Sequence, residues 1–178
     1  MTASEISEGA VLERARAVRL VVFDFDGVFT DNTVEVSQDG IESVRCWRGD
    51  GLGLQRLRQA GVAARVLSTE VNPVVSIRCR KLGIECLQGL PEKRTALGNL
   101  WAQGLATPDS TAYVGNDIND SGCLAAVGFP IVVADAHEDV VALAALITSA
   151  PGGRGAVREV CDLIVDSLSV DPAAERRP

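Results

Sequence analysis

Short apolar runs recur along the chain and are separated by segments with helical spacing. The clearest runs cover residues 18–23, 62–67, 111–114 and 129–133, and a weaker one covers 84–87. Apolar runs of about four to eight residues, bounded by glycine or polar residues, are typical of buried strands. We therefore predict a buried strand at each of these positions.

The segments between the runs predict helices. Asn72-Pro73 is a typical helix start, with Asn as the N-cap and Pro in the first turn, and Gly83 is suited to end that helix. Strands that alternate with helices need crossover connections. The pattern thus predicts an α/β fold, a doubly wound parallel sheet with helices on both faces in three layers. The other predicted helices cover residues 52–60, 91–103, 120–127, 137–147 and 154–168.

One region interrupts the alternation of strands and helices. Residues 33–36 and 41–46 are β-prone and flank Asp39-Gly40, a dipeptide that favours a hairpin turn. This predicts a small β-hairpin inserted after the first strand. Since we find no internal repeat and no linker, we expect one domain. The predicted division is a polar lead-in at 1–17, an α/β domain at 18–168 and a flexible charged tail at 169–178.

The composition limits the partners. The chain has 178 residues and a formal net charge of −7, whereas nucleic acids and anionic membranes are bound by clustered Lys and Arg. No run approaches the roughly 18 apolar residues of a membrane span, and the polar, acidic start does not resemble a signal peptide. The 5 cysteines form no CxxC pair and are expected to be reduced and structural. We expect a cytoplasmic protein with no nucleic-acid or membrane partner.

Polar side chains with catalytic potential follow the predicted strands. In open α/β sheets, ligands bind beyond the carboxyl ends of the strands. Acids, hydroxyls, an amide and a lysine are therefore expected to converge at one edge of the sheet. They are Asp24 and Asp26 after the first strand, Ser68, Thr69 and Glu70 after the second, Asn116 and Asp117 after the strand at 111–114, and Lys93 at a helix start.

This set of side chains favours phosphoryl transfer. Crowded carboxylate and amide oxygens suit Mg²⁺, which would also relieve their mutual repulsion. Asp24 could act as the nucleophile and form an aspartyl-phosphate, and Asp26 could then serve as general acid and base. Lys93 would neutralise charge on the transferring group, and Ser68 would donate a hydrogen bond to its oxygens.

Residues 24–30, DFDGVFT, resemble the DxDGVxT nucleophile motif of the haloacid dehalogenase (HAD) superfamily of phosphatases. Ser68, Lys93 and residues 115–120 match the second, third and fourth motifs in the same order. The resemblance implies a Rossmann-like HAD fold and a Mg²⁺ site formed by Asp24, the Asp26 carbonyl and the fourth motif. Many relatives have Asp directly after the glycine of that motif, where this chain has Asn116. We expect Asn116 to be the direct ligand, with Asp117 as the next candidate.

The stretches at 24–68 and 93–115 are too short to hold a cap domain. The chain resembles the capless branch that removes phosphate from 3-deoxy-D-manno-octulosonate 8-phosphate (KDO 8-phosphate) and from its sialic-acid counterparts. The hairpin, the loop at 48–53 and the GGRGAVRE segment at 152–159 carry this likeness. It implies a homotetramer whose active sites are completed by a neighbouring subunit.

Within this branch, Glu70 is the informative residue. KDO 8-phosphate enzymes typically have Arg at that position, whereas enzymes acting on KDN or N-acetylneuraminate 9-phosphate have Glu. Arg78 and Lys81 lie three residues apart, share a helix face, and could bind the sugar carboxylate while Glu70 accepts hydroxyl protons. This favours a nine-carbon substrate and leaves the eight-carbon one open. Thr69, Arg48 and Arg154 complete the candidate substrate-binding set.

Two other interpretations compete with the phosphatase. Related domains serve as non-catalytic tetramerisation modules in CMP-sialic acid synthetases, but this chain keeps the nucleophile, the acid, the hydroxyl and the lysine. A phosphorylatable receiver domain would carry its phosphoacceptor after the third strand, so the order of motifs excludes it. Taken singly, Glu70, Arg78 and Lys81 fit solvated surface charges equally well.

Overall fold

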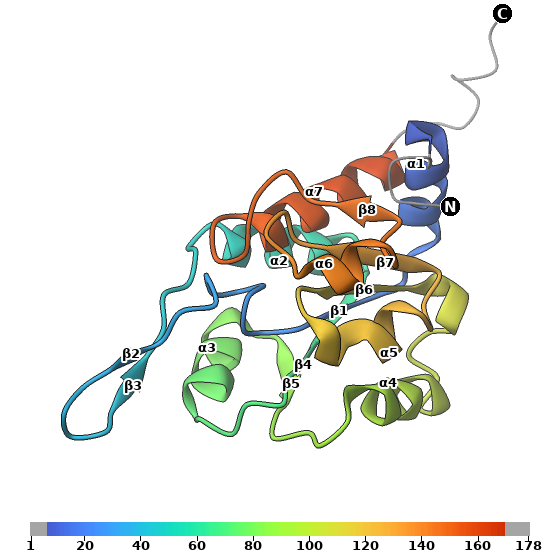
Figure 1. The fold of residues 1–178 in the computed structure, drawn as a ribbon. Coiled ribbons are helices and arrows are strands. Elements are labelled where there is room, and N and C mark those ends of the chain that lie inside the picture. Colours follow the sequence, from blue (N-terminus) through green and yellow to red (C-terminus); the bar gives the residue numbers. More distant parts are fainter. Residues whose placement is uncertain (1–6, 170–178) are drawn as a thin grey trace, which may run out of the picture.

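A six-stranded parallel sheet forms the centre of the computed structural model, which describes residues 7–169 (Figure 1). The spatial order is β5-β4-β1-β6-β7-β8, so the chain winds outward from β1 in both directions. This confirms the predicted doubly wound sheet, and it brings the carboxyl ends of β1, β4 and β6 together. The strands are β1 (Leu20–Phe23), β4 (Ala63–Leu67), β5 (Glu85–Leu87), β6 (Thr111–Gly115), β7 (Phe129–Val132) and β8 (Leu146–Ile147).

Helices cover the sheet in two layers, which completes the predicted three-layer arrangement. Within β1, Val21 and Phe23 belong to one apolar core, and Leu20 and Val22 belong to the other. Strands buried on both faces read as continuous apolar runs, which is why the sequence revealed them. The first core is shared by α1 (Glu8–Ala17), α2 (Asp50–Gln59), α3 (Val74–Leu82) and α7 (Ala156–Ser169), and the second by α4 (Lys93–Ala102), α5 (Ser121–Leu124) and α6 (Glu138–Val141).

The hairpin of β2 (Glu35–Val36) and β3 (Glu42–Ser43) projects away from the sheet (Figure 1). Its turn contains Gly40 at φ 79°, as the Asp-Gly pair predicted. Within the described residues it is the only sheet outside the central one, in agreement with the expected absence of a cap domain. No helix in residues 7–169 is long and apolar enough to span a membrane.

The prediction of one helix over 137–147 is wrong. A short helix, α6, ends at Val141, and Leu146 pairs with Ile131 to form the edge strand β8. Two paired residues leave no periodicity of their own, so neighbouring strands rather than local sequence decide this conformation. The predicted helix at 120–127 is likewise shorter, consisting of a 3₁₀ turn at Ile118–Asp120 followed by α5.

The predicted ends of the chain fall only partly within the described residues. Much of the polar lead-in is α1, which is capped by Ser7 and packs on α7 through Ala15. Ser169 is the last residue of α7 rather than the first of a tail. Residues 1–6 and 170–178, including most of the expected flexible tail, lie outside the described residues.

Candidate active site

Asp24 follows directly after β1 and is buried, with 4% of its surface exposed. Its Oδ1 accepts a hydrogen bond from the Phe25 N–H at 2.6 Å. Gly27 then turns the chain at φ 77°, and a Cβ there would lie 2.0 Å from the Asn116 Nδ2. The glycine is therefore needed both for its backbone conformation and for the close approach of the Asn116 side chain.

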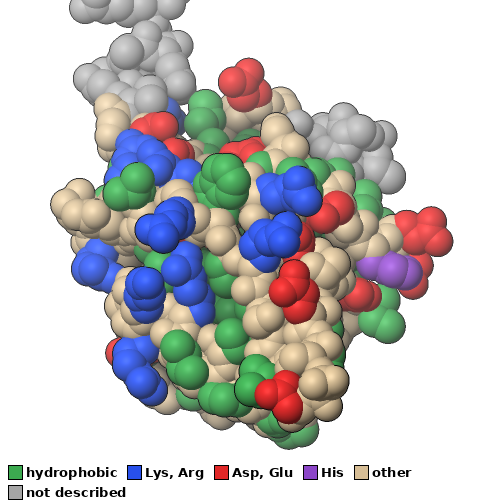
Figure 2. All heavy atoms as spheres, turned by 90° about the vertical axis from the view of Figure 1, so that its left-hand side faces the viewer, with side chains coloured by type: hydrophobic (Ala, Val, Ile, Leu, Met, Phe, Trp, Pro, Cys, Tyr) green, Lys and Arg blue, Asp and Glu red, His purple; other side chains and the backbone are tan. Residues whose placement is uncertain are grey.

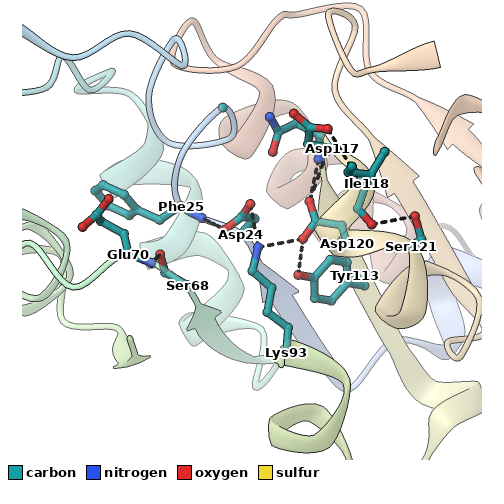
Figure 3. A network of polar contacts seen from close by, with 12 residues as sticks. Asp24, Phe25, Ser68, Glu70, Lys93, Tyr113, Asp117, Ile118, Asp120 and Ser121 are labelled. Atoms are coloured by element: carbon teal, nitrogen blue, oxygen red, sulfur yellow. Dashed lines mark hydrogen bonds and ion pairs between the residues drawn. The ribbon is translucent and has the colours of Figure 1, made fainter. Parts of the chain in front are cut away.

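Lys93, the first residue of α4, bridges two buried carboxylates (Figure 3). Its Nζ lies 2.8 Å from Asp24 Oδ2 and 2.8 Å from Asp120 Oδ1. The Tyr113 hydroxyl also donates to Asp120 Oδ1, at 2.7 Å, and the Asn116 N–H donates to Asp120 Oδ2, at 2.9 Å. Asp120 thus links the lysine to the loop that carries Asn116.

The pKa values in this cluster follow from burial and neighbouring charge. Burial and the Asp120 carboxylate raise the pKa of Asp24 to about 7, against the lowering effect of Lys93. Burial, followed by the charge of Glu70, raises the pKa of Asp26. Burial alone would lower the pKa of Lys93, but its two carboxylate partners outweigh burial and raise it. The lysine therefore stays charged, and Asp26 holds a proton more readily than an exposed Asp, as a general acid requires.

Oxygen atoms of Asp24, Asp26 and Asn116 converge in a set that fits Mg²⁺. The inward end of the Asn116 amide lies 3.3 Å from Asp24 Oδ2 and 2.9 Å from the Asp26 carbonyl oxygen. Neighbouring ligands of octahedral Mg²⁺ lie about 2.9 Å apart, given bonds of about 2.1 Å. With the amide oxygen inward the three oxygens form a partial cation cage, whereas with the amide nitrogen inward the residue donates to the other two.

Asp117 is oriented differently from Asn116. Its Oδ1 accepts the Ile118 N–H at 2.7 Å and caps the 3₁₀ turn that follows. It still lines the cavity above Asp24. The structure therefore brings Asn116, rather than Asp117, into contact with the two aspartates of the nucleophile turn.

Three adjoining cavities extend from Asp24 along the hairpin. The first, about 300 Å³, is lined by Asp24 and is here called the phosphoryl cavity. The second, about 250 Å³ and called the middle cavity, shares Asp26 and Asn32 with the first. The third, about 530 Å³ and called the basic cavity, shares Val44 and Val74 with the second. Because neighbouring cavities share lining residues, they lie next to one another, and the row of three is here called the groove.

The predicted hydroxyl and acid residues are distributed along this groove. Thr69 lines the phosphoryl cavity. Ser68 is buried and is not among the residues lining that cavity, and its Oγ accepts the Glu70 N–H at 3.1 Å. Glu70 lines the middle cavity, where its Oε1 accepts the backbone N–H groups of Val71 and Asn72. Its other carboxylate oxygen makes no hydrogen bond to the described residues and can accept one from a ligand.

The predicted basic residues separate into two groups. Arg48, Arg78 and Lys81 line the basic cavity, where Arg78 Nη2 donates to the Trp47 carbonyl at 3.0 Å. Arg154 is exposed and is not among the residues lining the three cavities. Figure 2 shows Lys and Arg side chains gathered on the side of the molecule from which the hairpin projects. Three of the four predicted basic residues therefore line the groove, and Arg154 does not.

Sequence reasoning did not single out Tyr113 or Asn32, and it included Asp120 only as the last residue of the fourth motif. Tyr113 is the only tyrosine of the chain and lies fully buried in a strand whose other residues are small, and this contrast was a usable signal in the sequence. Asn32 had no local signal beyond its proximity to the nucleophile motif. Its place between two cavities depends on how the hairpin leaves the sheet.

No family model matches the chain. KDO 8-phosphate phosphatase KdsC of Escherichia coli K12 is 35% identical over 156 residues, which cover 87% of this chain and 83% of that enzyme. The chain belongs to the KdsC-like phosphatases of the HAD superfamily. This confirms the predicted resemblance to the HAD phosphatases and to the branch that acts on KDO 8-phosphate.

Solved structures agree with this placement among the KdsC-like phosphatases. A Streptomyces avermitilis protein assigned to the HAD family hydrolases is 44% identical, with a TM-score of 0.83, over 89% of this chain and 92% of that one. The KDO 8-phosphate phosphatase of Moraxella catarrhalis, solved with magnesium, phosphate and KDO, is 32% identical. Its TM-score is 0.88, and the match covers 92% of this chain and 94% of that one.

Proposed function

We propose that this chain is a Mg²⁺-dependent phosphatase that hydrolyses an acidic 2-keto-3-deoxy sugar phosphate. The order of chemical groups along the groove is the observation that carries this proposal. A nucleophile beside a cation site comes first, carboxylates and amides that suit hydroxyls come next, and Arg48, Arg78 and Lys81 stand at the far end. A ligand that carries a phosphate at one end, hydroxyls in the middle and a carboxylate at the other end matches this order.

The reaction would begin on Asp24. Its carboxylate attacks phosphorus while Asp26 protonates the departing sugar oxygen, which leaves a phosphoryl group on Asp24. Asp26 then takes a proton from water, and the water oxygen attacks the same phosphorus and regenerates Asp24. Lys93 holds positive charge beside the reacting carboxylate throughout.

The Mg²⁺ would be held by the Asp24 carboxylate, the Asp26 carbonyl and the Asn116 amide oxygen, and when bound it supplies positive charge next to the phosphoryl oxygens. The magnesium in the Moraxella catarrhalis enzyme supports this choice of metal. Thr69, which lines the cavity, would donate to the same oxygens, whereas the predicted donor Ser68 is buried and does not line the cavity.

Two substrates of this class remain in competition. KDO 8-phosphate is favoured because the named relatives act on it. KDN or N-acetylneuraminate 9-phosphate is favoured by Glu70, whose anchored carboxylate lines the middle cavity and would accept hydroxyl protons. Glu70→Arg separates them, since it should reduce turnover of nine-carbon substrates more than of the eight-carbon one. Equal effects on both would remove the preference for nine carbons.

Phosphate release with Mg²⁺ tests the proposal directly. The panel contains KDO 8-phosphate, the two nine-carbon 9-phosphates and glucose 6-phosphate, which lacks the carboxylate. Asp24→Asn should lower kcat by at least about a thousandfold, because the nucleophile is lost. Asp109→Asn, which makes the same change at an exposed position, should leave the rate unchanged. Release from no acidic sugar phosphate would favour the tetramerisation module, and an active Asp24→Asn variant would refute the assigned nucleophile.

We further propose that the chain acts in the cytoplasm as a homotetramer in which the hairpin docks on a neighbouring subunit. The hairpin carries large exposed apolar side chains, with Val34 at 52%, Val36 at 63% and Ile41 at 66% exposure. A two-stranded hairpin is barely stable alone, and exposed apolar patches mark contact sites. A neighbouring copy would cover these side chains and narrow the open groove.

A further inference from the structure

Asn32 occupies the junction of the phosphoryl and middle cavities. Only Asn32 and Asp26 line both, so a ligand whose phosphate lies at Asp24 and whose body extends toward Glu70 would pass beside them. Asn32 is also exposed, and its side chain is therefore accessible from the groove. Sequence analysis gave this residue no role.

The backbone of Asn32 is left-handed, at φ 60°, and no other non-glycine residue in the described part of the chain is. Asparagine tolerates this conformation better than most residues, often because its side chain bonds to the local backbone. Here the backbone N–H donates to Thr30 Oγ1 at 3.3 Å, but the side-chain amide makes no hydrogen bond to the described residues. Glycine would adopt this left-handed conformation with less strain, so the backbone conformation does not explain why the residue is an asparagine.

The surroundings show what the amide can bind. Glu42 and Glu70, which line the middle cavity, are acceptors when ionised. The other amide lining that cavity, on Asn72, is engaged, since its Nδ2 donates to Glu42 at 2.9 Å and its Oδ1 accepts the Val74 N–H at 3.0 Å. A sugar hydroxyl both donates and accepts. The carboxylates can take its proton, and the unengaged Asn32 amide can donate to its oxygen.

We propose that Asn32 is a specificity-determining residue that hydrogen-bonds the hydroxyl group on the carbon next to the phosphate-bearing carbon. This rests on the proposed function and adds to it. The inference places recognition of the substrate's hydroxyl groups at the junction of the phosphoryl and middle cavities. This junction lies closer to the phosphate than Glu70 and the basic cavity do. An ester without hydroxyls next to its phosphate gains nothing from the amide.

Asn32→Gly is the decisive variant, because glycine keeps the left-handed backbone and removes only the side chain. For the preferred acidic sugar phosphate, kcat/KM should fall about tenfold, mainly through KM, which corresponds to about 1.4 kcal/mol. For p-nitrophenyl phosphate, which has no hydroxyl groups, kcat/KM should stay within about twofold.

The outcomes separate a failed inference from a failed function. An equal loss on both esters would mean that Asn32 only shapes the turn, and no loss on either would mean that its amide is unused. Either result overturns the inference while the phosphatase stands. A wild-type chain that cleaves p-nitrophenyl phosphate but no acidic sugar phosphate would overturn the proposed substrate class and this inference with it. An unchanged melting temperature of Asn32→Gly confirms that the comparison is between folded enzymes.

Discussion

At the scale of single residues, Asp120 holds the polar network together. It is fully buried and accepts hydrogen bonds from Lys93, Tyr113 and the Asn116 backbone (Figure 3). Since a buried carboxylate is costly without partners, each donor also stabilises the fold. Lys93 is therefore oriented by a residue that does not line the phosphoryl cavity.

Tyr113→Phe tests this network while preserving the ring. A hydrogen bond to a charged acceptor contributes about 1.5–3 kcal/mol, so the melting temperature should fall by roughly 3–12 °C. The turnover number should also fall several-fold because Lys93 is less firmly oriented. Thermal unfolding and phosphate release measure the two effects.

A matched control for this change is Thr111→Val, two residues earlier in the same strand, which removes the hydrogen bonds of the Thr111 hydroxyl with Trp101 Nε1 and the Thr107 carbonyl. It should reduce stability without changing turnover in the folded enzyme. A Tyr113→Phe variant as stable and as active as the wild type would contradict the assigned role of Asp120.

Asn116→Asp examines the cation site. The substitution adds a negative charge 3.3 Å from Asp24 Oδ2 in a buried position, so the metal-free protein should lose stability. Because Mg²⁺ binds a carboxylate more strongly than an amide, the rise in melting temperature on adding Mg²⁺ should be larger than in the wild type. Melting curves with chelator and with saturating Mg²⁺ provide the measurement. An equal rise in both proteins would show that Asn116 does not contact the metal.

At the scale of elements, the glycine-rich loop before α7 is a packed part of the site rather than a flexible turn. A Cβ on Gly152 would lie 1.9 Å from the Gly27 carbonyl oxygen, and the Gly153 N–H donates to Val28. The loop therefore packs directly on the nucleophile turn. Behind it, α7 makes extensive contact with α2, where Asp50 is buried among their first turns.

The buried carboxyl group of Asp50 should make the stability of the folded protein depend on pH. Burial raises its pKa to about 7, although the Arg158 N–H and the Arg78 charge act in the opposite direction, and neither carboxylate oxygen makes a well-formed hydrogen bond to the described residues. Because the folded pKa exceeds the unfolded value of 3.8, the folded state holds this proton more tightly. Rising pH therefore costs stability between about pH 4 and pH 7, and the penalty is complete above that range.

Asp50→Asn should remove this penalty. A shift of one pKa unit corresponds to about 1.4 kcal/mol. The free energy of unfolding of Asp50→Asn, relative to that of the wild type, should therefore rise by about 2–3 kcal/mol between pH 5 and pH 8. Thermal unfolding at these two pH values measures the difference, with Asp109→Asn as the exposed control whose effect should not vary. If the stability difference between Asp50→Asn and the wild type stays constant or shrinks as pH rises, ionisation of Asp50 does not destabilise the folded protein.

At the scale of the whole molecule, the hairpin links assembly to the open groove. Val36→Lys with Ile41→Lys should dissociate the proposed tetramer, because charges would replace the apolar side chains at the contact. Light scattering after size exclusion measures the mass, and kcat/KM for the sugar phosphate should fall with it. Asp39→Lys changes the charge of the same hairpin without removing apolar surface and should leave the tetramer intact. A double variant of unchanged mass would place the contact elsewhere.

The sequence by itself determined the strands of the sheet other than β8 and most of the site. Strands buried on both faces leave uninterrupted apolar runs, and the residues after them must meet at one edge of a parallel sheet. Asp24, Asp26 and the segment with Asn116 could therefore be placed by position, whereas the choice of Asn116 as ligand also needed the resemblance to the HAD motifs.

Tertiary structure decided the features that depend on neighbouring elements. Strand β8 exists only because β7 offers an edge to pair with. Adjacent residues with similar chemistry were separated by the direction of their side chains: Asn116 faces the aspartates while Asp117 caps a turn, and Thr69 lines the cavity while Ser68 lies buried. A local pattern cannot fix such directions, because they depend on contacts between segments far apart in the chain.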